Sequence, residues 1–274
     1  MQKNKGLVKA VPKELLAELE QSYPVERNIN RVYLPRLGMV SQDVIEEVKD
    51  KKTGKKKINV ITEAGTFYTE VQSDELDENG KKTWERTELG TTIEAIIIFE
   101  RKQLKFYDSD NNTFINSPIF DSPDEVVPLF SKGKEISRGT PAELKKDYPG
   151  LSSKGKPLSK LQDVRVLYVL LENVLYQLSL QGTSAYSFAD YKKSILHPNT
   201  WVTQFESEHM ENGSTVWNKM VFGAVRAITA EEAERVVEIT REIKAGIDQA
   251  QAFYANQRTE EAAADREFAR LTAK

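Results

Sequence analysis

The chain has 274 residues, of which 39% are hydrophobic and 30% are charged, and its formal net charge is −3. A hydrophobic share of this size supports a packed core and excludes global disorder. The acidic excess lies near the C-terminus, because residues 229–274 hold 10 Asp/Glu and 7 Lys/Arg, which leaves 32 of each in residues 1–228. A neutral body is compatible with nucleic-acid binding, since such binding depends on a local basic face.

The sequence has no cysteine, which excludes disulfides, thiolate zinc sites and cysteine nucleophiles and suits a reducing compartment. Its first residues lack the apolar core of a signal peptide, and no apolar run approaches the roughly 18 residues of a membrane span. We therefore expect a cytoplasmic protein that does not cross a membrane.

Residues 1–24 are expected to form an arm and a short helix that carries Leu15, Leu16 and Leu19 on one side. The main domain is expected to span residues 25–228. It begins with a segment in which Arg31, Tyr33 and Arg36 alternate with apolar residues, and Pro35 marks that segment as an edge strand or a bulge. The arginines either face water or present the strand to a phosphate-and-base ligand.

Strand patterns follow one another up to residue 107. Lys49–Lys57 is read as a solvated loop that either faces water or follows a phosphate backbone. Thr91–Glu100 has a continuous Ile-rich core typical of a central strand, and we expect Leu104–Tyr107 to be its hairpin partner after a turn at residues 101–103. The other expected strands are Ile58–Thr62, Thr66–Val71 and Trp84–Glu88.

Residues 109–162 are rich in Pro, Gly and Ser and are interpreted as a long insertion in the domain, because strand patterns resume immediately after it. The insertion is basic: residues 132–165 hold nine Lys/Arg against four Asp/Glu. Within it, the spacing of Thr140 and Glu143 predicts a capping box at the start of a small helix.

Residues 163–223 predict a hairpin, a short helix and a second hairpin. Glu172-Asn173 separates Val164–Leu171 from Val174–Leu180, and Asn212-Gly213 lies between Trp201–Met210 and Thr215–Phe222. The helix is expected over residues 185–195. This order predicts a mainly β protein with flanking helices (α+β), in which an OB-like antiparallel barrel carries the long basic insertion.

Residues 229–274 are predicted to form a C-terminal amphipathic helix. Thr229 is its expected N-cap with Glu232 three residues on, and an apolar stripe runs from Ala233 to Tyr254. The stripe packs either on its own domain or on a second copy, which would make residues 229–257 a homo-oligomer contact.

No pattern of a cofactor or metal site is found. His197 and His209 lack metal-ligand spacing, and the phosphate-binding and nucleophile motifs are absent. The triplet Glu100-Arg101-Lys102 resembles the E-x-K of metal-dependent nucleases, with Glu85 or Glu88 as a further ligand, although a turn explains it better. We therefore expect no catalytic site, no cofactor and no enzymatic activity.

Aromatic residues next to cations recur on the expected strands, for example Phe67-Tyr68, Trp84 with Arg86, and Trp217 with Lys219. Exposed rings stack on bases at about 1–3 kcal/mol each, and the cations follow phosphates. Most strand aromatics belong to a core, as we expect for Phe99, Phe205 and Phe222. The predicted nucleic-acid contacts are Arg31, Tyr33, Arg36, Trp84, Lys102, Lys105, Tyr107, Lys192, Lys193 and Trp201.

Several segments in this order support a family resemblance: Tyr33-Leu-Pro-Arg-Leu37, Gly65–Tyr68, Ile93–Lys102, Arg165–Ser194, Trp201–Glu206 and Met220–Phe222. Over residues 30–228 the chain resembles the OB-fold single-stranded-DNA-binding-like proteins of tailed bacteriophages. Such proteins often carry cysteines in the insertion, suggesting a small zinc element, and this chain has none. It also ends in Arg270-Leu-Thr-Ala-Lys274 and not in the acidic, aromatic-tipped tail that many single-strand binders use to recruit partners.

The resemblance implies sequence-tolerant binding of single-stranded DNA in phage DNA replication or recombination, in the host cell cytoplasm, with replication or recombination proteins as further partners. The alternative is a non-catalytic protein-interaction or assembly factor that dimerises through the C-terminal helix. A metal-dependent nuclease that uses Glu100 is the third interpretation.

Overall fold

A computed structural model describes residues 34–49, 56–76, 78, 82–151 and 155–243. The predicted N-terminal helix, Arg31, Tyr33 and most of the C-terminal helix lie outside these residues. Packing divides the chain into two compact units. Within the described chain, unit 1 comprises residues 34–100 and 164–236, and unit 2 comprises residues 101–163 and 237–243.

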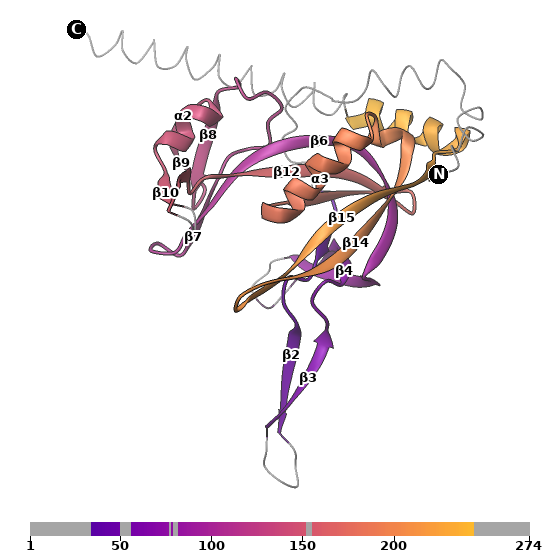
Figure 1. The fold of residues 1–274 in the computed structure, drawn as a ribbon, viewed down its shortest axis with the longest axis horizontal. Helices are drawn as coiled ribbons and strands as arrows, with labels where there is room; N and C mark the ends of the chain where they lie inside the picture. The colour runs from indigo at the N-terminus through magenta and orange to yellow at the C-terminus, as the bar shows by residue number, and fades with distance from the viewer. Residues whose placement is uncertain (1–33, 50–55, 77, 79–81, 152–154, 244–274) are drawn as a thin grey trace. The chain divides into compact units, whose positions relative to one another are not determined.

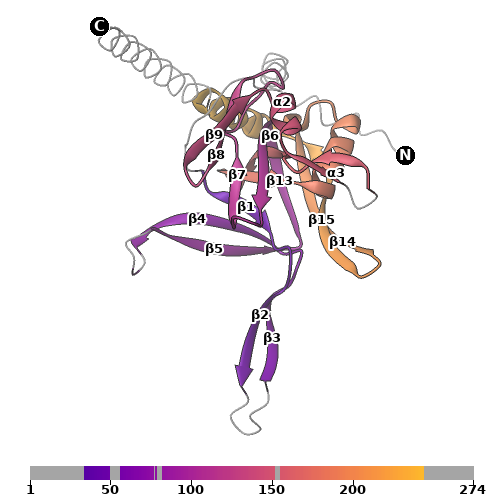
Figure 2. The same ribbon diagram turned by 90° about the vertical axis from the view of Figure 1, so that its left-hand side faces the viewer.

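Unit 1 is built on the strands β6, β12 and β13, which are successive neighbours in the sheet, and on the hairpin of β14 and β15 (Figure 1). The strand order along its sheet is β5-β4-β1-β13-β12-β6-β14-β15, and β2 pairs with β3 in a separate ribbon (Figure 2). The strands are β1 (Arg36–Met39), β2 (Val44–Lys49), β3 (Lys56–Thr62), β4 (Phe67–Leu76), β5 (Lys82–Gly90), β6 (Thr92–Asp108), β12 (Gln162–Leu171), β13 (Val174–Leu180), β14 (Trp201–Asn212) and β15 (Thr215–Ala227). The helices between β13 and β14 are α3 (Gly182–Ser194) and the short 3₁₀ turn η2 (Pro198–Thr200).

Both predicted hairpins are confirmed. Glu172 and Asn173 have φ of 50° and 65°, as a two-residue turn between right-twisted strands requires, and β12 pairs with β13 on either side of them. In the second hairpin Gly213 has φ of 63°, a conformation that glycine adopts without strain. There β14 extends to Asn212, two residues further than the hydrophobic pattern indicates.

The core of unit 1 lies between the sheet and α3. The helix buries Phe188 and Tyr191 against β15, and the N–H of Met220 on that strand donates to Ser184 Oγ at 2.9 Å. Phe222 packs edge-on against both Phe188 and Phe205, with ring centroids 5.3 Å and 5.2 Å apart. The predictions for Phe99 and Phe205 as core residues are confirmed, whereas Phe222 is only partly buried.

The strand β6 differs from the expectation of a turn at residues 101–103. It runs without a break over 17 residues, from Thr92 to Asp108, and its hairpin partner is β7 (Thr113–Asn116). The ladder continues because the backbone of Lys102 pairs with Phe120 and the side chain of Arg101 is buried against Asp121. A run of three polar residues therefore lies inside a strand.

The sheet of unit 1 is not closed by hydrogen bonds among the described strands. Closure of the path β13-β12-β6-β14-β15 would require β15 to pair with β13. Instead β1 pairs with β13 in parallel, Arg36 opposite Gln177, and the described part of β15 pairs with β14. The structure is mainly β with few helices, as predicted, but it does not demonstrate a barrel.

Unit 2 contains the second half of β6 and the regular elements of the predicted insertion. Its sheet has the order β6-β7-β8-β9, and β10 pairs with β11 in a ribbon of its own. The further elements are β8 (Val127–Ser131), β9 (Lys134–Gly139), α2 (Pro141–Lys146), β10 (Pro149–Leu151) and β11 (Pro157–Ser159). The capping box predicted for Thr140 and Glu143 is present at α2. The core consists of Leu104, Ile115, Phe120, Val127, Leu129, Leu144 and Leu161.

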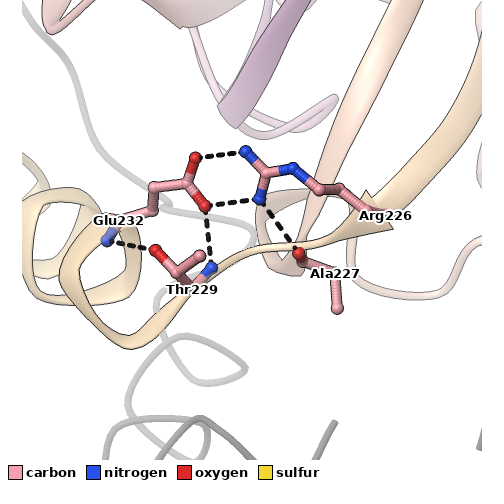
Figure 3. A network of polar contacts seen from close by, with 4 residues as sticks. All are labelled: Arg226, Ala227, Thr229 and Glu232. Carbon is pink, nitrogen blue, oxygen red and sulfur yellow. Dashed lines mark hydrogen bonds and ion pairs between the residues drawn. The ribbon is translucent and has the colours of Figure 1, made fainter. Parts of the chain in front are cut away.

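Residues 230–243 are helical, as predicted. Thr229 and Glu232 bond each other in both directions, the reciprocal pattern of a capping box, and Arg226 joins them (Figure 3). In the described part of this helix Ala233, Val236, Val237 and Thr240 are buried within the chain. Among the described residues, no helix has the length and apolar character needed to cross a bilayer.

Candidate nucleic-acid interface

One face of β1, β4 and β5 gathers arginines and aromatic rings. Arg36 lies opposite Glu70, which lies opposite Arg86, and Trp84 lies opposite Gln72 two residues along. Because laterally paired residues and residues two apart share a face of a sheet, these side chains point to the same side. We call Arg36, Tyr68, Glu70, Trp84 and Arg86 the arginine–aromatic face.

The opposite side of β1 belongs to the core, where Leu37 is 3% exposed. The arginine–aromatic face is therefore the outer side of the sheet. On β13 it reaches Gln177, which pairs with Arg36. Beyond Gln177 the same side of β12 is buried, since Tyr168 is 2% exposed.

Each arginine of this face lies over a ring. Cζ of Arg36 is 4.7 Å from the ring centroid of Trp84, and Cζ of Arg86 is 3.9 Å from that of Tyr68. Such contacts contribute about 0.5–1 kcal/mol at exposed sites. Trp84 keeps 37% of its surface exposed, so part of its indole is accessible from solvent.

Tyr68 lies directly over Gly38 of the neighbouring strand. A Cβ atom built at Gly38 would come within 2.5 Å of Cζ of Tyr68, which is closer than any real contact. Glycine at this position therefore allows the side chain of Tyr68 to lie against β1 while its ring contacts Arg86.

Two carboxylates balance the charge of this face. Nη2 of Arg86 donates to Glu70 at 2.8 Å, and this bond raises the pKa of Arg86 above its ordinary value. Glu88 accepts a hydrogen bond from the Thr62 hydroxyl. The face is thus suited to stacking on flat groups more than to strong attraction of phosphates.

The predicted contact Lys192 has a structural partner. Its Nζ lies 2.5 Å from Glu100, and Arg165 donates to the other oxygen of the same carboxylate. Glu100 is almost completely buried, with 7% of its side chain exposed. Lys192 therefore neutralises a buried charge, whereas its neighbour Lys193 is exposed and pairs with Asp190 at 2.7 Å.

The ion pairs of Glu100 also concern the interpretation of Glu100-Arg101-Lys102 as part of a metal site. A metal ion at Glu100 would have to displace both cations from its carboxylate. Arg101 points into unit 2, where its Nε and Nη2 donate to Asp121 at 2.6 Å and 2.9 Å. Within the described ranges no group of three or more His, Cys, Asp or Glu residues could hold a metal ion.

The remaining predicted contacts are distributed over both units. Lys102, Lys105 and Tyr107 lie on the part of β6 that belongs to unit 2, and Tyr107 is exposed. Trp201 is half-buried at the start of β14, opposite Ala227. Of the predicted residues that the structure describes, Arg36 and Trp84 lie in direct contact.

Tyr68 and Arg86 are members of the face that the predicted set of contacts does not include. The signal for them is present in the sequence, since Trp84 and Arg86 are two residues apart on one strand and Tyr68 lies in a short strand pattern. What the sequence lacks is the register that places β4 between β1 and β5.

Comparisons with protein-family models, with curated proteins and with solved structures find no significant match.

Proposed function

We propose that this protein binds single-stranded DNA with little sequence preference, and that the arginine–aromatic face of unit 1 is the contact surface. The observation that carries the proposal is the pairing of Arg36 with Trp84 and of Arg86 with Tyr68 on one outer face. Rings stack on bases of any identity, and arginines add phosphate and stacking contacts.

The strand order of unit 1 supports the same function. A meander β6-β12-β13, a helix, and a strand β14 that returns to the free edge of β6 follow one another as in an OB-like barrel. OB folds bind oligonucleotides on the face of their second and third strands. Those strands correspond to β12 and β13 here. Because that side of β12 is buried, with Tyr168 2% exposed, the proposed contact surface lies beside them on β1, β4 and β5. A role in phage DNA replication or recombination accords with the family that the sequence resembles.

The proposed roles can be separated by salt. Trp84→Ala removes a stacking ring, so we expect about tenfold weaker binding of a labelled strand of about 30 nucleotides and an unchanged dependence on salt. Arg36→Ala removes a phosphate contact, so the slope of log K against log salt should fall by about 0.7. Fluorescence titrations at low and moderate salt measure both quantities.

Tyr186→Ala is the matched control, because Tyr186 is an aromatic residue of unit 1 that is 75% exposed on α3, outside the face. It should leave the affinity unchanged. Equal affinity for the strand and for its duplex, or no binding at low salt, would contradict the proposed function.

A further inference from the structure

Unit 2 presents a second set of aromatic rings on the outer side of its sheet. Tyr107 on β6 lies opposite Phe114 on β7, and Lys105 lies opposite Asn116, which in turn pairs with Phe130 on β8. These residues share a face by register. We call Lys105, Tyr107, Phe114, Asn116 and Phe130 the unit 2 outer face.

The core of unit 2 lies on the other side of the same strands. Ile115 is buried in it, and Phe106 packs against it. The rings of the outer face are therefore not needed to complete that core. Even so, Phe114 is 59% exposed and Tyr107 is 47% exposed. Adjacent exposed rings on a sheet commonly mark an interaction surface.

The two exposed rings are held in a defined arrangement. Their centroids are 4.9 Å apart and their planes are inclined by 50°. The hydroxyl of Tyr107 donates to Asn112 Oδ1 at 2.6 Å, which ties this ring to the β6–β7 turn. A ring that is already oriented loses less conformational entropy when a ligand stacks on it.

Charge favours a polyanion as the occupant. Residues 101–163 contain 11 Lys/Arg and 9 Asp/Glu, a balance of +2, whereas the whole chain has −3 and the remaining residues therefore −5. Lys105 lies on the face itself, and Lys132 and Lys134 are exposed at the β8–β9 turn. The carboxylate of Glu135, next to Phe130 by register, is bound by Arg138 at 2.8 Å.

We infer that the unit 2 outer face is a second base-stacking surface for single-stranded nucleic acid, with Phe114 and Tyr107 as the rings that contact bases. This inference rests on the proposed function and extends it, since one chain then contacts a strand at two separate surfaces. Because the two rings act by stacking, their loss lowers affinity without changing the salt dependence.

The test is a set of substitutions at Phe114 in the full chain, titrated with the same labelled strand of about 30 nucleotides. Phe114→Ala and Phe114→Leu should each raise Kd about tenfold, because both remove the π face, whereas Phe114→Tyr should keep wild-type affinity. Leu151→Ala is the matched control, since Leu151 is 72% exposed in the same unit but lies on β10. Thermal melts show whether each variant is folded.

A second measurement does not depend on a variant that folds. A strand carrying 5-iododeoxyuridine is irradiated on the wild-type protein, and the cross-linked peptides are sequenced. Cross-links at Tyr107 or Phe114 are expected, and cross-links confined to unit 1 would overturn the inference.

Comparison with Trp84→Ala separates this inference from the proposed function. If Trp84→Ala weakens binding and Phe114→Ala does not, the second surface is refuted and the site in unit 1 is retained. If only Phe114→Ala weakens binding, the unit 2 outer face is retained and the site in unit 1 is refuted. If neither change matters, or the wild type does not bind, both are refuted.

Discussion

The carboxylate of Glu232 accepts three hydrogen bonds from two residues at the start of the helix that follows β15. Two come from Arg226, at 2.7 Å and 2.8 Å, and one comes from the N–H of Thr229 at 2.7 Å (Figure 3). The hydrogen bonds from Arg226, followed by those from Thr229, lower the pKa of Glu232 from 4.5 to about 2 in spite of its partial burial. One side chain thus caps the helix and joins it to β15.

This pKa predicts the pH dependence of stability. A lowered folded pKa means that the contribution of Glu232 is complete above pH 4.5 and is lost as the pH falls towards 2. We expect Glu232→Gln to cost about 1–2 kcal/mol at pH 7, a value reduced because the pair is partly exposed. The difference from wild type should shrink between pH 4.5 and pH 2 in urea unfolding curves.

The neighbouring Glu231 is exposed and provides the control. Glu231→Gln should change stability by no more than about 0.5 kcal/mol at any pH. A cost of Glu232→Gln that stays constant down to pH 2 would show that the carboxylate charge is not responsible.

At the scale of single elements, register between short strands creates the arginine–aromatic face. Four residues of β1 hold Arg36 against Trp84 and place Gly38 under Tyr68. A shift of one residue would move every side chain of β1 to the other face, so Leu37 would leave the core and Arg36 would enter it. Burial of Leu37 therefore maintains the position of Arg36.

Gly38→Ala tests this arrangement. Its methyl group would displace the ring of Tyr68, since three atoms of that side chain lie within 2.9 Å of the new Cβ. We expect about fivefold weaker binding of single-stranded DNA with a loss of stability near 1 kcal/mol, because the tyrosine can rotate towards solvent. The affinity is measured by titration and the stability by thermal unfolding.

A double-mutant cycle identifies the cause. In a Tyr68→Ala background there is no ring to displace, so Gly38→Ala should have little further effect on binding. Equal effects in both backgrounds would place the cause in the backbone of β1.

At the scale of the whole molecule, β6 contributes its first half to unit 1 and its second half to unit 2. The first side chain of the second half is Arg101, which is fully buried and paired with Asp121. Since a buried guanidinium is costly without its carboxylate, this pair makes the fold of unit 2 sensitive to one residue.

Asp121→Asn should destabilise unit 2 by about 3–5 kcal/mol, because it leaves a buried charge without a counter-charge. Hydrogen exchange resolves the effect by segment, and amides of β7 and β8 should lose protection while those of β12 and β13 keep it. Glu135→Gln, which breaks an exposed ion pair of the same unit, should cost less than about 1 kcal/mol. Equal loss of protection in both units would show that they unfold together.

Much of the fold could be predicted because it depends on local patterns. The hairpin turns at Glu172-Asn173 and Asn212-Gly213, the helix that buries Phe188, and the caps at Thr140 and Thr229 are each determined within a few residues. The prediction of a turn at residues 101–103 was wrong, because Arg101 forms a buried ion pair with Asp121, twenty residues away, and this pair outweighs the local polarity of the segment.

The contact residues were less predictable, because a charged side chain has the same sequence signature whether it binds a ligand or a buried partner. Lys192 is paired with Glu100, which lies 92 positions away in the chain. The residues next to Lys192 in the sequence do not indicate this ion pair. The joining of Arg36 to Trp84 depends in the same way on the position of β4 between β1 and β5.

The sequence by itself thus determined most strands of unit 1, their tight turns and the caps of the helices, since these follow from side-chain alternation and from backbone conformation over a few residues. Only the tertiary structure decided which strands became neighbours, where the ladder of β6 continued, and which cations were already neutralised. Those outcomes depend on pairing between distant segments, where burial and register select one arrangement among many that are locally equivalent.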